Sequence, residues 1–147
     1  MNQPQPRKVI GTFELVEFPE FHVKGAVAKI DTGAYTGALH CTNIKVEKTP
    51  EGRRLHFAPL GDTSQEVVMD KFAIRNVKSS NGENQKRYFV STYILVRGEK
   101  YPISITLADR SEMRWPVLIG RRFLRHNHFL VDVSKNATYV EQIEETV

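Results

Sequence analysis

Residues 28–41, AKIDTGAYTGALHC, place an acid, a hydroxyl residue and a glycine directly after an apolar run. The residues before Asp31 have the character of a buried strand, and the small residues after Gly33 predict a turn that leads the chain away again. Ionising a carboxylate at the end of a buried strand is expensive, because burial favours the neutral acid. Asp31 therefore requires either a structural partner or a chemical role.

The sequence on both sides of this stretch is dominated by strand signals. Short segments of alternating or apolar residues are separated by polar or proline-containing turns. These segments cover residues 11–18, 21–30, 40–49, 53–60, 65–77, 86–97, 101–108 and 128–133. One helix is expected at residues 120–127, where Phe123 and Leu124 give an apolar side. The pattern predicts an all-β fold, a small closed or partly closed barrel with one short C-terminal helix.

Length and composition indicate one ordinary globular domain. The 147 residues are 40% hydrophobic and 26% charged, and a chain of this length can bury a core. We expect a single domain over residues 1–147, with a core of about residues 10–141 and loose ends. The single cysteine, Cys41, excludes an intrachain disulfide and a multi-thiolate zinc site. The polar start, MNQPQPRKVIG, has no apolar signal core, so a cytoplasmic protein without a membrane partner is expected.

The net charge of +4 is a weak indication of function. Basic residues are spread along the chain without interleaved aromatics, and their densest cluster, GRRFLRHNH, lies on the expected helix. We therefore expect no nucleic-acid ligand. The charge supports at most a mild preference for acidic partners.

The DTG of residues 31–33 is the residue combination of an aspartic protease loop. Asp31 would supply the carboxylate, the Thr32 hydroxyl would fix the loop, and Gly33 would let the backbone approach closely. Two such carboxylates that face each other share one proton, because ionising both is costly. The ionised one takes a proton from water while the other donates to the scissile carbonyl. The simpler interpretation of Asp31, a turn acid at a strand end, stays open on these three residues alone.

The order of motifs along the chain resembles the retropepsins, the single-domain aspartic proteases of retroviruses. An apolar strand, DTGA, a hairpin with a polar tip, a turn at RGEK and an Ile-Gly-Arg junction before a helix follow one another within residues 25–133. More closely, KIDTGAYTGALH with RSEMRWPVLIGRRFL resembles a bacterial family of retropepsin-like aspartic endopeptidases. That family also carries the label ATP-dependent zinc protease, and its members are often encoded near ATP-grasp ligases that add glutamates to proteins.

The resemblance implies a catalytic loop, a substrate-binding surface and a supporting junction. It makes Asp31 the catalytic carboxylate, in a loop completed by Thr32 and Gly33. The implied substrate-binding residues are Ala34, Tyr35, Ser79, Ser80, Asn81 and Gly82, the last four in a flap at residues 79–84 that would close over a peptide. The junction that would support the site is Ile119, Gly120 and Arg121. Because the chain holds one DTG, the resemblance implies a homodimer in which each Asp31 lies beside its twin.

Two features depart from the retroviral pattern. Retroviral members have an acid two positions after the DTG glycine, whereas this chain has Tyr35, so Arg121 lacks its expected partner. Asp109 and Arg110 are candidates for a substitute near Arg121, and a solvated loop is the alternative. The hairpin at residues 40–60 is longer than the viral form needs, and the flap loop lacks the viral glycine-rich character.

The residues themselves do not support the zinc label. A zinc protease typically carries His-Glu-x-x-His on one helix, and this spacing does not occur here. His40 and Cys41 are strand neighbours that point to opposite faces, and His126 and His128 have no clear third ligand. A glycine-rich phosphate loop with its lysine is also absent from the sequence. We expect no metal and no cofactor, so any ATP dependence would come from a partner.

Two functional classes are compatible with the sequence. One is an aspartic endopeptidase that acts on a restricted protein or peptide substrate through paired Asp31 carboxylates. The other is a non-catalytic module that regulates an ATP-grasp glutamate ligase or recognises acidic peptide tails. For Arg121, a surface or structural ion-pair role is the alternative to supporting the site. Asp132 is expected to cap a strand end under either functional class.

Overall fold

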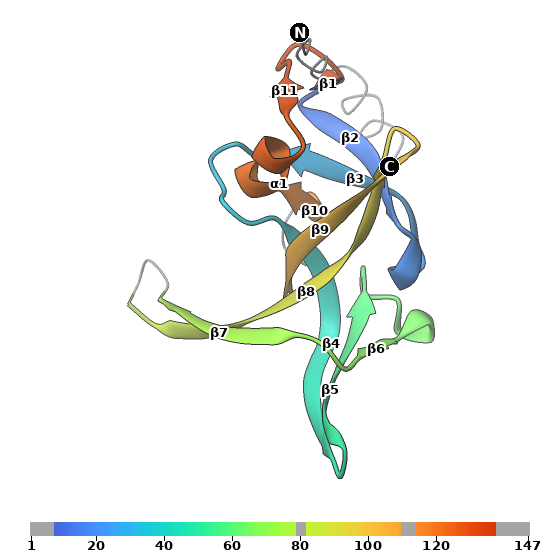
Figure 1. Cartoon of the computed structure of the whole chain (residues 1–147), viewed down its shortest axis with the longest axis vertical. Helices are drawn as coiled ribbons and strands as arrows, with labels where there is room; N and C mark the ends of the chain where they lie inside the picture. Colours follow the sequence, from blue (N-terminus) through green and yellow to red (C-terminus); the bar gives the residue numbers. More distant parts are fainter. Residues whose placement is uncertain (1–7, 79–81, 110–113, 138–147) are drawn as a thin grey trace, which may run out of the picture.

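The computed structural model describes residues 8–78, 82–109 and 114–137, and it is built almost wholly from strands (Figure 1). The strands are β1 (Lys8–Ile10), β2 (Phe13–Phe18), β3 (Val23–Ile30), β4 (Ala38–Thr49), β5 (Gly52–Pro59), β6 (Val67–Met69), β7 (Ala73–Lys78), β8 (Asn84–Val96), β9 (Glu99–Ala108), β10 (Val117–Ile119) and β11 (Phe129–Val131). Helix α1 (Arg121–His126) and two short 3₁₀ turns, Pro19–Phe21 and Thr63–Gln65, complete the elements of these residues. In the described residues, no helix has the length and apolarity needed to cross a membrane.

Six strands close into a barrel. Their order is β10-β3-β2-β8-β9-β4, and β4 pairs back to β10. The alternation of side chains explains why these segments form a barrel wall: on β2, Val16 and Phe18 are buried while Leu15 and Glu17 are exposed. The prediction of a small all-β barrel with one short C-terminal helix is confirmed.

One cluster of buried apolar side chains draws residues from all six barrel strands. Phe21 and Phe57 meet edge to face in this cluster, with ring centroids 5.2 Å apart. Cys41 on β4 is fully buried there, and desolvation raises the pKa of its thiol to about 12. Cys41 is thus a core residue and not an available nucleophile or ligand.

Two hairpins project from the barrel in Figure 1. The outer parts of β4 and β5 form one at the bottom of the view, with β6 paired to β5. Strand β7 and the first part of β8 form the other, at the left. The segment at residues 65–77, expected as one strand, is therefore two, because β6 pairs with β5 while β7 pairs with β8.

A small parallel sheet of β1 and β11 joins the two ends of the described chain. Its register pairs Val9 with Leu130, and the Asp132 backbone N–H donates to the Ile10 carbonyl at 2.8 Å. Strand β1 begins two residues before the expected core, and its last residue, Ile10, is buried in the core cluster. The ends expected to be loose, before residue 8 and from about residue 142, lie outside the described residues.

Candidate functional site

The loop at residues 31–37 connects β3 to β4 and passes over the end of β10. Strand β10 lies between the two strands that the loop joins, parallel to β3 and antiparallel to β4. The loop therefore has to cross the point where β10 ends and α1 begins. This arrangement brings the two sequence motifs, DTG and Ile-Gly-Arg, into contact.

Backbone hydrogen bonds fasten this loop to the β10–α1 junction. The Asp31 N–H donates to the Ile119 carbonyl at 2.8 Å, where the ladder between β3 and β10 ends. The N–H groups of Arg121 and Arg122 donate to the carbonyls of Ala34 and Tyr35 at 2.8 and 3.0 Å. The first turn of α1 thus finds its acceptors in the loop, which satisfies donors that a helix start leaves free.

Two glycines make this close crossing possible. A Cβ atom on Gly120 would lie 2.6 Å from the Tyr35 carbonyl oxygen, and one on Gly37 would lie 2.3 Å from that of Leu118. Both distances are too short for real contacts. Gly120 was expected as a supporting residue. Gly37 was missed, and its only signal in the sequence is its place in the small-residue run TGA.

Asp31 is partly exposed at the start of the loop, and Thr32 and Gly33 are exposed beside it. The Gly33 N–H donates to Asp31 Oδ1 at 3.0 Å, a bond that orients the carboxylate. Asp31 Oδ2 accepts no hydrogen bond from the described residues. The carboxylate is therefore held in place and open to a ligand or to a second copy of the chain.

Arg121 has two partners in the loop in place of the missing acid. Its Nη1 donates to the Gly33 carbonyl at 3.1 Å, and its guanidinium lies 5.4 Å from the centroid of the Tyr35 ring. The aromatic side chain thus provides a cation–π contact where an acid would have made an ion pair. Asp109 was a candidate for the missing acid beside Arg121, and its Oδ1 lies 3.8 Å from His40 Nδ1. Arg110, the other candidate, is outside the described residues.

The flap expected at residues 79–84 is described only in part. Ser79, Ser80 and Asn81 lie outside the described residues, and Gly82 is exposed with a φ of 85°. The strands that lead to this segment pair in register, with Lys78 opposite Asn84. A hairpin is present where the resemblance places a flap, and its role in binding stays a prediction.

Three further residues that the sequence analysis considered, Asp132, His126 and His128, lie outside the loop at residues 31–37. Asp132 Oδ1 accepts hydrogen bonds from Ser134 N and Oγ at 3.0 and 2.6 Å, which lower the pKa of Asp132 and hold a turn after β11. His126 and His128 are both exposed. Within the part of the chain that the structure describes, no three His, Cys, Asp or Glu side chains are grouped as metal ligands would be.

Comparisons with known proteins agree with this geometry. The family model described as RimB-like, retropepsin-like aspartic endopeptidase RimB, matches residues 9–142. A probable alpha-L-glutamate ligase of Shewanella pealeana is 33% identical over 136 residues, which are 87% of this chain and 29% of that protein. One of the same name from Desulfotalea psychrophila is 29% identical over 126 residues, 82% of this chain and 27% of that protein. The chain thus spans less than a third of the length of these relatives.

The fold also occurs in a solved structure. A crystal structure of a protein of unknown function (DUF785) from Legionella pneumophila matches with a TM-score of 0.69 and 22% identity. The match covers 88% of this chain and 95% of that one.

Proposed function

The chain belongs to the RimB-like family of retropepsin-like aspartic endopeptidases, and we propose from this premise that it is itself an aspartic endopeptidase acting as a homodimer. The observation that carries the proposal is the fastened loop: Asp31 is oriented by the Gly33 N–H, and its backbone is tied to the β10–α1 junction. A catalytic carboxylate has to be held in this way, because small displacements of a reacting group cost large factors in rate.

The proposed reaction needs two copies of Asp31. The chain contains one DTG, so the second carboxylate comes from a partner related by a two-fold axis. The two carboxylates share a proton. The ionised one removes a proton from a water molecule, and the protonated one donates to the carbonyl oxygen of the scissile peptide bond. The flap hairpin would then cover a bound protein or peptide segment and exclude bulk water.

The surface beside the loop supports a binding role. A groove of about 590 Å³ runs next to the catalytic loop, and it combines hydroxyl, basic and apolar groups. Its lining includes Thr32, Arg121, Leu124, Arg125 and Leu130. This groove has the size and mixed chemistry of a site for a peptide or for a second protomer.

Peptide cleavage by two single-residue variants tests the proposal. The purified protein is incubated with a diverse peptide library from acid to neutral pH, with and without a metal chelator, and cleavage is scored by mass spectrometry. Asp31→Asn should lower the cleavage rate about 10²–10⁴-fold, because it removes the general base, and chelation should have no effect. Asp132→Asn is the matched control, because that acid holds the turn after β11. Equal cleavage by the wild type and Asp31→Asn would refute the proposal.

A second function is favoured by the relatives. The proteins that match this chain are named probable alpha-L-glutamate ligases, and the match covers 29% of the Shewanella pealeana protein. A module of this family that regulates an ATP-grasp glutamate ligase, or binds acidic peptide tails without cutting them, accounts for that association. An oligoglutamate peptide that binds wild type and Asp31→Asn equally and stays intact, together with no cleavage of the peptide library, would support this module and contradict the peptidase.

A further inference from the structure

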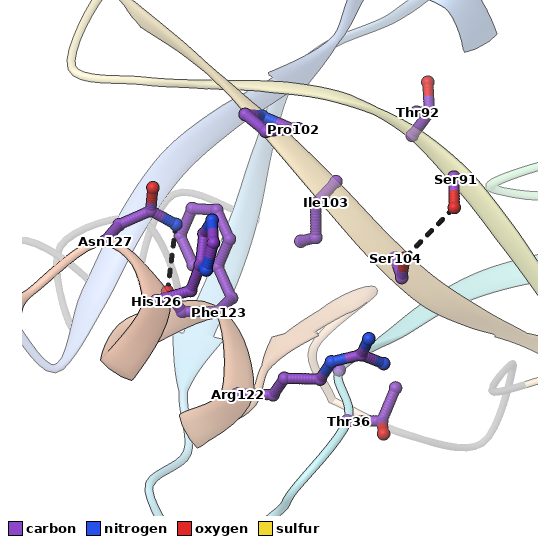
Figure 2. Close-up of a pocket in the computed structure, with 11 residues that line it drawn as sticks. Thr36, Ser91, Thr92, Pro102, Ile103, Ser104, Arg122, Phe123, His126 and Asn127 are labelled. Atoms are coloured by element: carbon purple, nitrogen blue, oxygen red, sulfur yellow. Dashed lines mark hydrogen bonds between the residues drawn. The ribbon is translucent and has the colours of Figure 1, made fainter.

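A second cavity lies on the other side of α1 from the groove described above. It has a volume of about 260 Å³, lies between α1 and the paired strands β8 and β9 (Figure 2), and is open to solvent on one side. Figure 2 shows Arg122 and His126 on the helix side and Ser91 and Ser104 on the strand side. The cavity is too small for a folded segment of another protein and suits a small molecule or ion.

The helix side of the cavity offers a guanidinium and an imidazole, both of them exposed. Arg122 and His126 are four residues apart in α1, so their side chains lie on one face of the helix. In the described part of the chain, neither residue has a carboxylate within ion-pair distance. The guanidinium offers several N–H donors in a planar fork that suits an oxyanion.

The strand side adds a hydroxyl donor. The Oγ atoms of Ser91 and Ser104 lie 3.0 Å apart and share one hydrogen bond, with either serine as donor. Two hydroxyls have two protons and their mutual bond uses one, so the other proton can be donated into the cavity. Thr36, at the end of the loop that begins with Asp31, contributes a third hydroxyl residue to the lining.

Apolar side chains form part of the remaining wall, together with the polar Thr92 and Asn127. Pro102, Ile103 and Phe123 line the cavity, and Ile103 and Phe123 are buried. Arg122 is itself exposed, so these apolar side chains remove water from one side of a bound anion only, which still strengthens its interaction with the guanidinium. We propose that this cavity is a binding site for a small oxyanion, held by Arg122 and His126 from α1 and by the serine hydroxyls from β8 and β9.

The site is next to the catalytic loop in sequence and in space. The Arg122 backbone N–H donates to the Tyr35 carbonyl, and Thr36 and Gly37 line the cavity. An anion bound to the Arg122 side chain would hold this end of the loop in place. The proposal does not depend on peptidase activity, because binding is measured without a substrate.

Binding of inorganic phosphate and of glutarate tests the site. Each probe is titrated into the full chain while the melting temperature and the amide NMR shifts of residues around Arg122 are followed. Saturable binding should raise the melting temperature with increasing ligand concentration. Arg122→Gln and Ser104→Ala should weaken binding, the first about tenfold or more, since it removes a charged hydrogen-bond donor. The probe that binds more tightly distinguishes a phosphate ligand from a carboxylate ligand.

Arg125→Gln is the matched control, because Arg125 is on the same helix but lines the groove that contains Thr32. It removes the same charge and should leave binding unchanged. The NMR spectrum of each variant verifies its fold. Equal weakening by Arg122→Gln and Arg125→Gln would show a diffuse charge effect and overturn the proposal. The absence of saturable binding by both probes at tens of millimolar would overturn it as well.

Discussion

Gly120 shows how the crossing of two chain segments dictates a residue type. Its φ of −90° is open to every amino acid, so backbone conformation does not require glycine here. The requirement comes from space, because a Cβ would lie 2.6 and 2.8 Å from the carbonyl oxygen and carbon of Tyr35. The glycine of the Ile-Gly-Arg junction is therefore needed for the loop to lie on the helix start.

Gly120→Ala is expected to destabilise the fold by roughly 1–3 kcal/mol, the usual cost of forcing a methyl into a packed site. Gly25→Ala is the control. Gly25 has a φ of 65° but nothing within 4 Å of its Cβ position, so its substitution carries the conformational strain without a clash. Urea unfolding of both variants measures the difference. A larger loss for Gly25→Ala would show that the loop shifts easily away from Gly120.

The Tyr35 ring and the Arg121 guanidinium, 5.4 Å apart, form the second contact that defines the loop. A double-mutant cycle with Tyr35→Leu and Arg121→Met should give a coupling energy of about 0.5–1 kcal/mol, the usual value for a cation–π contact at an exposed site. Chemical unfolding of the wild type, both single variants and the double variant supplies the four free energies. Additive losses would show that Arg121 acts through the Gly33 carbonyl alone.

The elements were predictable to the extent that local pattern determines them. Alternation on β2 and on Ile103–Leu107 of β9, and the short apolar run within β3, are visible in the sequence because each strand keeps one side in the core. The division of residues 65–77 into β6 and β7 was not predictable, because it follows from a change of pairing partner. The same holds for β1, whose three residues form a strand only because β11 pairs with them.

The candidate site was predictable as two motifs and not as one structure. DTG and Ile-Gly-Arg are 85 or more residues apart, and only the insertion of β10 between β3 and β4 brings them together. The residue that contacts Arg121 could not be predicted from the sequence either. A tyrosine that replaces an acid gives no sequence signal that its ring will contact the arginine. Catalytic and substrate-binding roles for these residues stay predictions.

The outer hairpin of β4 and β5 is joined to β6 by a histidine between two acids. His56 on β5 has Nδ1 at 2.8 Å from Glu66 Oε1 and Nε2 at 3.1 Å from Glu47 Oε2. The hydrogen bond with His56 holds the pKa of Glu66 below its ordinary value of 4.5. A lowered carboxyl pKa adds stability above the ordinary pKa, and this stability is lost as the pH falls through the folded value.

We therefore expect the β5–β6 contact to weaken as the pH falls from 4.5, the ordinary pKa of a glutamate, through the lower value at which Glu66 takes up a proton in the folded protein. Amide exchange or NMR shifts of β6 measured between neutral and acid pH would follow the change. Glu66→Gln should remove this pH dependence, while Glu17→Gln on the exposed side of β2 should keep it. An unchanged titration of β6 in Glu66→Gln would mean that His56 and Glu66 do not hold the two strands together.

The described part of the molecule presents an apolar surface where β1 pairs with β11. Val9 and Leu130, paired across β1 and β11, are 40% and 45% exposed, and Val133 beyond β11 is 77% exposed. Leu130 also lines the groove that contains Thr32, so this surface is continuous with the loop at residues 31–37. Burial of this surface against a second copy would stabilise a dimer and bring the loops of the two copies together.

Mixed dimers test whether two Asp31 side chains form one site. If random exchange is allowed between equal amounts of wild type and Asp31→Asn, about one quarter of the dimers are fully wild type. A site that needs one protonated and one ionised carboxylate is inactive in all dimers that contain an Asp31→Asn chain. Activity per total protein should therefore fall to about one quarter. Mixing with Asp132→Asn should leave activity unchanged, which controls for dilution, and native mass spectrometry of the mixture, with one of the two proteins isotope-labelled, verifies that the subunits have exchanged. Activity of about one half would instead mean that each chain cuts alone with a single carboxylate, and the homodimeric mechanism would be wrong even if Asp31 is essential.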